Sequence, residues 1–175
     1  LRCDYQTFAR GILPTKPKAS PHALPPRSFA GSLLKAAWWL MCYTLGYYRR
    51  VHPTKARGGL VINHRYLLDA IVDPKRYRYA GPMQLLKWIW AVAPKPDLLI
   101  FLDAPAAVIQ QRKQEVPFAE TARMREAYLA LAKSLPNARI IDASQVQEKT
   151  IDDVTETLLG FMSARLSKQM RRWRS

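Results

Sequence analysis

Residues 59–82, GLVINHRYLLDAIVDPKRYRYAGP, decide the predicted fold of this chain. The stretch opens with a short apolar run, Leu60–Ile62, which is typical of a buried strand in a parallel sheet. Arg65 follows just past the expected end of that strand, which is where open α/β sheets bind their ligands. A guanidinium group matches a phosphate group through two parallel hydrogen bonds. We therefore expect Arg65 to hold an anion.

Further cations and aromatic rings follow within the same stretch. Arg76 and Arg78 alternate with tyrosines, and Asp69 and Asp73 lie among them. One interpretation is that the arginines line a pocket for an anionic ligand, with Tyr66 stacking or packing beside it. The alternative is that these cations and carboxylates only pair with one another on the surface, because ion-pair networks imitate binding sites.

The length and the composition bound the class of protein. A chain of 175 residues suits one domain with a real core, and 49% hydrophobic with 23% charged residues is ordinary for a globular protein. The charge balance is not ordinary, since 28 lysines and arginines face 13 acidic residues, which gives a net charge of +15. Such an excess favours polyanionic partners: nucleotides, nucleic acid or an anionic membrane surface.

The most apolar stretch is 29–48. Twenty residues are long enough to cross a bilayer, and aromatic residues in the stretch resemble interfacial anchors. Lys35 lies inside the stretch, however, and the strand-helix pattern that follows needs a helix as a packing partner. We therefore predict a helix buried against a sheet, from which Lys35 can project toward a ligand cleft. Membrane insertion is the alternative.

Helical and strand patterns alternate over the rest of the chain. Two short segments, 98–102 and 138–142, predict buried strands. Strands separated by helices pair in parallel through right-handed crossovers, so the predicted fold class is α/β, a parallel sheet flanked by helices. Asp103 follows the first of these strands and is expected to cap the next helix rather than to reach a ligand. Helices are expected at 82–93, 104–111 and 123–135, and from 144 or 150 to 162.

Several of these motifs, in this order, resemble one family. His64-Arg65-Tyr66, followed by DPKRYRYAGP at 73–82, is similar to a strand end and the loop after it in the thymidylate kinase-like branch of the P-loop nucleoside-monophosphate kinases. The resemblance covers roughly the last two thirds of the chain, and the order of the motifs adds to their weight. It continues through PDLLIFLDAP at 96–105, RKQE at 112–115, RMREAY at 123–128 and IIDAS at 140–144.

The resemblance implies a reaction and a site. The reaction is transfer of the γ-phosphate of ATP, with Mg²⁺, to a nucleoside monophosphate, thymidylate first, or to a related phosphorylated compound. Arg65 is then expected to grip the acceptor phosphate, while Arg112 and Lys113 lie where the family has the lid that moves over the transferred group. No residue is assigned to a metal. The expected substrate-binding residues are Tyr66, Arg76, Arg78 and Arg123.

Two departures from the family pattern lower the activity expected of this chain. His64 stands where the family has a carboxylate, and imidazole is a poor ligand for Mg²⁺. No Gly-x-x-x-x-Gly-Lys-Ser/Thr loop occurs, so the N-terminal part of the kinase fold is expected to be incomplete. We therefore expect little or no phosphate transfer by this chain alone. The second interpretation is a degenerate kinase fold whose basic surface binds nucleic acid or an anionic surface.

The sequence also suggests three parts: an extended, proline-rich basic segment at 1–28, the α/β domain at 29–166 and a basic tail at 167–175. No signal segment opens the chain, and Cys3 and Cys42 have no metal-ligand spacing, so we expect two lone thiols and a cytoplasmic protein. The expected partner is a nucleotide or phosphorylated small molecule. Further candidates are a second copy of the chain, nucleic acid and an anionic membrane surface.

Overall fold

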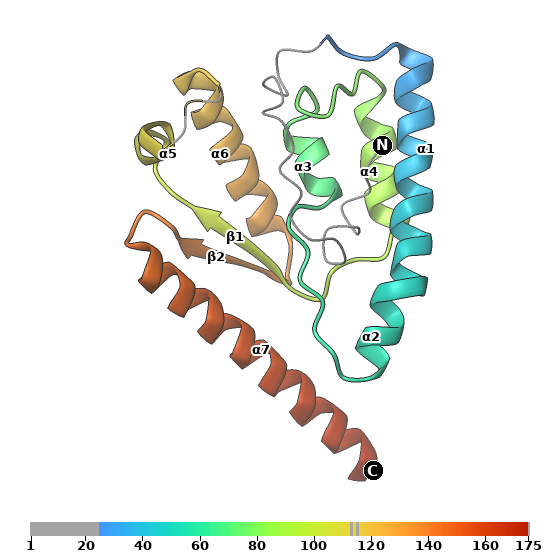
Figure 1. Ribbon diagram of the computed structural model, residues 1–175, viewed down its shortest axis with the longest axis vertical. Helices are drawn as coiled ribbons and strands as arrows, with labels where there is room; N and C mark the ends of the chain where they lie inside the picture. Colours follow the sequence, from blue (N-terminus) through green and yellow to red (C-terminus); the bar gives the residue numbers. More distant parts are fainter. Residues whose placement is uncertain (1–24, 113, 115, 175) are drawn as a thin grey trace, which may run out of the picture. The chain divides into compact units, whose positions relative to one another are not determined.

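The computed structural model describes residues 25–174 with the exception of 113 and 115. The chain forms two compact units, Leu1–Lys95 and Pro96–Ser175, which we call unit 1 and unit 2. Helices α1 to α4 belong to unit 1, and both strands belong to unit 2 (Figure 1). The three-part division expected from the sequence, with boundaries after residues 28 and 166, stays a prediction.

Helix α1, Phe29–Gly46, confirms the expected apolar helix, but its packing partner in unit 1 is helix α4 (Met83–Val92) and not the expected sheet. It begins at Ser28, whose Oγ accepts a hydrogen bond from the Gly31 N–H at 3.2 Å. The chain continues as helix through a π-helical turn, η3 (Tyr47–Val51), into the short helix α2 (His52–Ala56). None of the described helices combines the length and the apolar composition needed to span a bilayer. The buried residues of α1 share one face of the helix: Ser32, Ala36, Trp39 and Tyr43.

Two further helices complete unit 1. Helix α3 spans Leu67–Val72 and helix α4 spans Met83–Val92, with Pro82 directly before α4, as the sequence predicts. Helix α4 packs against both α1 and α3. Large apolar and aromatic side chains of all three helices, and of the residues next to α3, fill the core of unit 1. They include Trp39, Tyr43, Tyr66, Leu67, Leu86 and Ile89.

Unit 2 is built on a two-stranded parallel sheet. Strand β1 (Leu99–Asp103) pairs in parallel with β2 (Ala138–Asp142) over their full lengths, which confirms the two predicted strands and their direction. Helices α5 (Ala106–Arg112) and α6 (Phe118–Ser134) connect the strands, and α6 contacts both of them. Helix α7 (Gln147–Arg174) follows β2 and packs against it.

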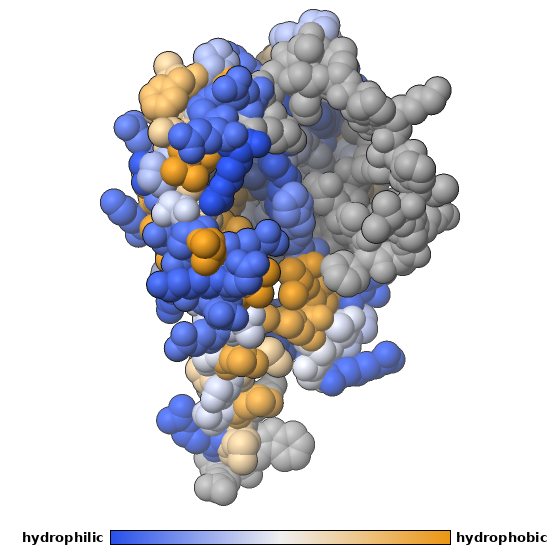
Figure 2. Space-filling model, turned by 60° about the vertical axis from the view of Figure 1, so that its left-hand side comes forward, coloured by the Kyte–Doolittle hydropathy of each residue, from blue (hydrophilic) through white to orange (hydrophobic). Residues whose placement is uncertain are grey.

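Helix α7 continues through the residues that the sequence suggested as a basic tail. Large apolar side chains are exposed along it, and hydrophobic and hydrophilic residues lie side by side over the C-terminal end of the chain (Figure 2). One apolar stripe of α7 is therefore uncovered by unit 2. It includes Ile151, Leu159, Leu166 and Met170.

The predicted strand Leu60–Ile62 is the main correction. These residues form neither a strand nor a helix, and Leu60 and Ile62 are 42% and 58% exposed. A strand is held by hydrogen bonds to a neighbouring strand, and the two strands that the structure describes pair with each other. The α/β class therefore holds only in part, because the described chain is mainly helical with one small parallel sheet. Helices η3, α2 and α3 were not predicted.

The cysteines also differ from the expectation. Cys42, on α1, is disulfide-bonded, and no free cysteine occurs among the residues that the structure describes. Cys3 lies outside those residues. The expectation of two lone thiols is therefore wrong, and the argument for a reducing compartment that rested on it does not hold.

Candidate anion-binding site

Arg65 lies directly before helix α3 in a strained backbone conformation. Its φ of +72° falls in the left-handed region, which costs a residue with a β-carbon about 1–3 kcal/mol. The first turn of α3 holds this segment: the Asp69 Oδ2 accepts a hydrogen bond from the Tyr66 N–H at 2.9 Å, and its Oδ1 lies 3.6 Å from the Arg65 Nη1. One carboxylate thus restrains both the backbone after Arg65 and the guanidinium group.

The ring of Tyr66 is part of the core of unit 1. It lies 4.6 Å from the ring of Tyr43 and 5.9 Å from the ring of Trp90, measured between centroids. Its hydroxyl group donates to the Pro94 carbonyl. These contacts explain why Tyr66 is buried. Because Tyr66 follows Arg65 in the chain, its buried ring also fixes the position of the backbone at Arg65. Its expected contact with a substrate stays a prediction.

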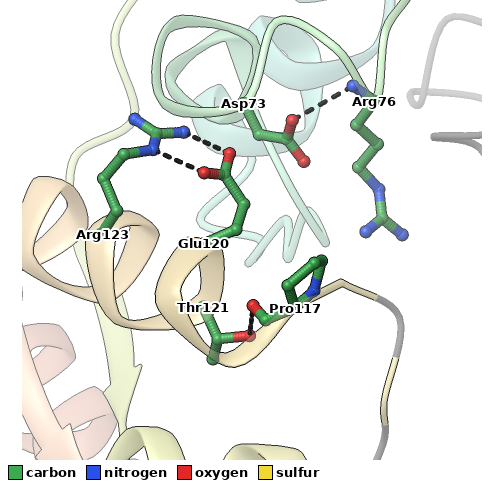
Figure 3. A network of polar contacts seen from close by, with 6 residues as sticks. All are labelled: Asp73, Arg76, Pro117, Glu120, Thr121 and Arg123. Carbon is green, nitrogen blue, oxygen red and sulfur yellow. Dashed lines mark hydrogen bonds and ion pairs between the residues drawn. The ribbon is translucent and has the colours of Figure 1, made fainter.

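The loop after α3 carries Arg76 and Arg78. The buried Asp73 accepts a hydrogen bond from the Arg76 N–H at 3.1 Å (Figure 3). Arg78 has a φ of +53°, also in the left-handed region. Its Nε donates to the Pro25 carbonyl at 2.7 Å, and its own carbonyl accepts from the Arg27 N–H at 3.1 Å. The segment before α1 therefore holds Arg78 in a conformation that is costly in isolation.

Lys35 of α1 lies beside this loop. Its ammonium group donates to the Tyr77 carbonyl and stands 4.8 Å from the centroid of the Trp39 ring. Burial, followed by the nearby positive charges of Arg27 and Arg78, lowers the pKa of Lys35 from 10.5 to about 8. The sequence signal for this residue was a lysine inside an apolar helix. That signal did not reveal which other cations approach it.

In unit 2, Arg112 ends helix α5 and binds backbone carbonyl groups. Its Nη1 donates to the Ala143 carbonyl at 2.7 Å, and its Nη2 lies 3.5 Å and 3.4 Å from the carbonyl oxygens of Ser144 and Gln145. These residues follow β2, so Arg112 joins α5 to the loop at the carboxyl end of the sheet. Lys113, the other expected lid residue, lies outside the described residues.

Arg123 and Arg125, on α6, bind different carboxylates. Arg123 donates to both oxygens of Glu120, at 2.9 Å and 2.7 Å, on the exposed surface (Figure 3). Arg125 donates to both oxygens of Asp103, at 2.7 Å each, beside the carboxyl end of β1. These hydrogen bonds from the guanidinium group to Asp103 raise the pKa of Arg125. Asp103 thus pairs with α6, which corrects the expectation that it caps α5.

The two described carboxylates of unit 1, Asp69 and Asp73, do not fit the Mg²⁺ site that the family resemblance implies. Mg²⁺ takes oxygen ligands in a near-octahedral arrangement. Asp69 is engaged by Tyr66 and Arg65, and Asp73 is engaged by Arg76 in a buried position. Across residues 25–174, apart from 113 and 115, no three histidine, cysteine, aspartate or glutamate side chains converge as a metal site would require.

Curated relatives were found by sequence comparison, whereas no family model matches the chain. The chain is 31% identical over 121 residues to a probable thymidylate kinase of Pyrobaculum aerophilum, a match that covers 64% of this chain and 60% of that protein. It is 33% identical over 126 residues to the thymidylate kinase of Xylella fastidiosa strain 9a5c, covering 65% and 57%. A probable thymidylate kinase of Thermococcus kodakarensis is 30% identical over 124 residues, covering 63% and 58%. The chain thus spans less than two thirds of the length of the relatives it matches.

Proposed function

We propose that this chain, a distant relative of thymidylate kinases, supplies the acceptor-binding side of an ATP-dependent phosphotransferase. The proposed acceptor is a nucleoside monophosphate, thymidylate first, or a related phosphorylated compound. Phosphoryl transfer asks a protein mainly to position the reactants and to stabilise negative charge. The cations of unit 1 are suited to holding such an acceptor.

Arg65 is the observation that carries this proposal. Arg65 has a strained φ, and its Nη1 lies 3.6 Å from the Asp69 Oδ1. Its side chain is 34% exposed. These features favour a residue that is positioned for a ligand rather than for the core. A surface ion pair at this separation contributes little, about 0–1 kcal/mol. Charge-assisted hydrogen bonds to a phosphate group are stronger, so a phosphorylated acceptor competes with Asp69 for Arg65.

The proposal assigns supporting roles to other cations. Arg76 and Arg78 bind the acceptor, and the resemblance to the family gives the lid role to Arg112, Lys113 and Arg123. Arg112 and Arg123 bind carbonyl groups and Glu120 in the present structure. Each has to exchange these partners to take part in transfer, as a residue of a moving lid does.

We further propose that this chain alone transfers phosphate poorly or not at all. The sequence contains no Gly-x-x-x-x-Gly-Lys-Ser/Thr loop, whose backbone N–H groups and lysine bind the phosphates of ATP in P-loop kinases. ATP, when bound, would supply the phosphoryl group. The residues of this chain contribute the grip on the acceptor.

The test measures binding of thymidine monophosphate to the full chain by calorimetry at constant ionic strength. Arg65→Ala is expected to weaken binding about tenfold or more, because it removes charge-assisted hydrogen bonds worth about 1.5–3 kcal/mol. Arg57→Ala, which removes an exposed arginine of unit 1, is the matched control and should change the affinity less than about twofold. Equal effects of the two substitutions would contradict the role of Arg65.

Turnover is measured on the same preparation with ATP, Mg²⁺ and thymidine monophosphate. We expect thymidine diphosphate to form no faster than in a control without protein. Formation well above that background would refute the statement that the chain alone is inactive, while leaving the acceptor site intact.

The charge of unit 1 favours a second candidate function, a binding module for nucleic acid. Unit 1 contains sixteen lysines and arginines and three acidic residues. Such a module would bind DNA with a steep salt dependence and little sequence preference. Arg65→Ala and Arg57→Ala would then weaken DNA binding to a similar degree. Saturable nucleotide binding that depends on Arg65 favours the kinase proposal over this one.

A further inference from the structure

A second group of cations in unit 1 lies apart from Arg65. The ammonium group of Lys35 donates to the Tyr77 carbonyl, and the Arg78 Nε donates to the Pro25 carbonyl at 2.7 Å. Arg27 is joined to Arg78 by the hydrogen bond from its N–H to the Arg78 carbonyl, at 3.1 Å. Three residues with positive side chains therefore come from the segment before α1, from α1 itself and from the loop after α3. We call Arg27, Lys35 and Arg78 the three-cation cluster.

Nothing described in the chain neutralises the three-cation cluster. Residues 25–95 contain twelve lysines and arginines but only two carboxylates, Asp69 and Asp73. Asp69 is bound by Tyr66 and Arg65, and Asp73 is bound by the Arg76 N–H. Among the described residues, the ion pairs involve none of the three cations of the cluster.

The surroundings of the cluster retain hydrogen-bond donors for a ligand. An ammonium group has three N–H bonds, and Lys35 uses one on the Tyr77 carbonyl. A guanidinium group has five, and Arg78 uses the Nε on Pro25. The Ser32 Oγ, on α1, accepts a hydrogen bond from the Ala80 N–H at 3.0 Å, so the side chain of Ser32 and the loop are held together at this point. The donors are thus attached to a rigid seam between α1 and the loop.

Helix geometry separates the cluster from Arg65. Lys35, Trp39 and Tyr43 lie on one face of α1, four residues apart. Tyr43 contacts Tyr66, the neighbour of Arg65, whereas Lys35 contacts Tyr77. Eight residues of helix span about 12 Å. The two cationic centres therefore lie at different points along the same seam.

We propose that the three-cation cluster is a binding site for a phosphate-class oxyanion that is centred on Lys35 and does not include Arg65; it uses Arg78, to which the kinase proposal gives a supporting role. Two guanidinium forks and one compact ammonium charge match the oxygens of a terminal phosphate group, which carries more charge per oxygen than a phosphodiester. The anion removes the repulsion among the three cations, and the lowered pKa of Lys35 agrees with that repulsion. This site does not depend on the kinase proposal, because it requires only the contacts of unit 1.

The first experiment titrates inorganic pyrophosphate into the full chain by calorimetry at constant ionic strength. Lys35→Met keeps most of the apolar stem, and Arg78→Gln keeps a polar side chain; each is expected to weaken binding tenfold or more. Lys87→Met, which removes an exposed cation of α4 in unit 1, should change the affinity less than twofold. Affinities of Lys35→Met and Arg78→Gln that match the Lys87→Met control overturn the proposal.

A second measurement uses the unaltered chain and so does not depend on how the variants fold. Lysine side chains are acetylated with limiting reagent, with and without saturating pyrophosphate, and the modified positions are quantified by mass spectrometry. Pyrophosphate is expected to slow the acetylation of Lys35 at least fivefold and that of Lys87 less than twofold. An unchanged rate at Lys35 overturns the proposal.

Two further arms separate this site from the other proposals. Arg65→Ala should leave the pyrophosphate affinity within twofold, even if thymidine monophosphate does not bind at all. Loss of pyrophosphate binding in Arg65→Ala but not in Lys35→Met overturns the separate site.

A single-stranded thymidine oligonucleotide without terminal phosphates supplies phosphodiesters only. Lys35→Met should change its affinity less than twofold, and a loss confined to the oligonucleotide overturns the assignment to a terminal phosphate group.

Discussion

Unit 1 and unit 2 differ in their balance of positive and negative residues and in how these residues are paired. Unit 1 contains sixteen lysines and arginines against three acidic residues, whereas unit 2 contains twelve against ten. In unit 2, Arg125 binds Asp103 and Arg123 binds Glu120, each through two hydrogen bonds. In unit 1, burial and then the positive charges of Arg27 and Arg78 lower the pKa of Lys35.

This difference indicates that an external anion would lower the electrostatic energy of unit 1 more than that of unit 2. Paired charges contribute to the stability of a fold without any ligand, although the contribution is small when the pair is exposed. Cations gathered without carboxylates repel one another, and this repulsion is relieved when an anion binds. The net charge of +15 is therefore not spread over the molecule, because nearly all of it belongs to unit 1.

The largest effect is expected from the Asp103–Arg125 pair of unit 2. Asp103→Asn leaves Arg125 without the carboxylate that accepts its two hydrogen bonds, and we expect the free energy of unfolding to fall by more than in the other variants below. Urea unfolding at pH 7 measures this change. Glu156→Gln, on the exposed surface of α7, is the control and should lower stability by less than about 0.5 kcal/mol. An effect of Asp103→Asn no larger than that of the control would contradict internal pairing in unit 2.

A smaller effect, with a definite sign, is expected from the pH dependence of unit 1. Below pH 8, Lys35 is protonated in both the folded and the unfolded chain, so the cost of holding this cation in the fold is fully present. Between about pH 8 and pH 10.5 the folded chain releases this proton while the unfolded chain keeps it. Stability should therefore rise with pH in that window. The groups that face Lys35 are the guanidinium groups of Arg27 and Arg78 and the ring of Tyr77.

The measurement compares urea unfolding of the unaltered chain with Lys35→Met from pH 7 to pH 10. The difference in the free energy of unfolding should change in favour of the unaltered chain as the pH rises, because other titrating groups cancel in the comparison. Lys87→Met should stay parallel to the unaltered chain. Parallel curves for Lys35→Met would show that Lys35 is not destabilised by its surroundings.

The smallest effect is expected at the exposed pair of α6. Arg123→Ala removes an ion pair in which the arginine side chain is 54% exposed, and we expect a loss of less than about 0.5 kcal/mol in the free energy of unfolding. The same urea unfolding experiment detects the difference from Asp103→Asn. A loss near 2 kcal/mol would mean that Arg123 has a structural role beyond its pair with Glu120.

The sequence predicted the elements that local pattern controls. The strand at 138–142, the strand at 98–102 to within one residue, and the helices at 29–48 and 82–93 follow from apolar spacing and proline positions, and the structure confirms them. The strand at 60–62 failed, because an apolar run does not specify the neighbour that a strand requires. Helix α3 was missed because its six residues are too few to show a clear period.

The candidate site was predicted less completely than the elements. The family motif predicted a ligand-binding role for Arg65, which stays a prediction; the structure adds its position before α3 and a left-handed φ that has no signature in the sequence. Arg125 was visible as a residue without an assigned role, and Lys35 was expected to project toward a ligand cleft. Their partners, Asp103 at a distance of 22 residues and Tyr77 at a distance of 42, are brought near only by folding.

The sequence by itself determined the distant similarity to thymidylate kinases, the excess of positive charge in the first half of the chain and the helices and parallel strands of the second half. These properties depend on residue types and on their spacing along the chain, so they can be read without coordinates. Only the tertiary structure decided which charged side chains form ion pairs and which cations lie close to other cations. Electrostatic energy depends on distance and burial, and contacts such as Asp103–Arg125 and Tyr77–Lys35 exist only after the chain has packed.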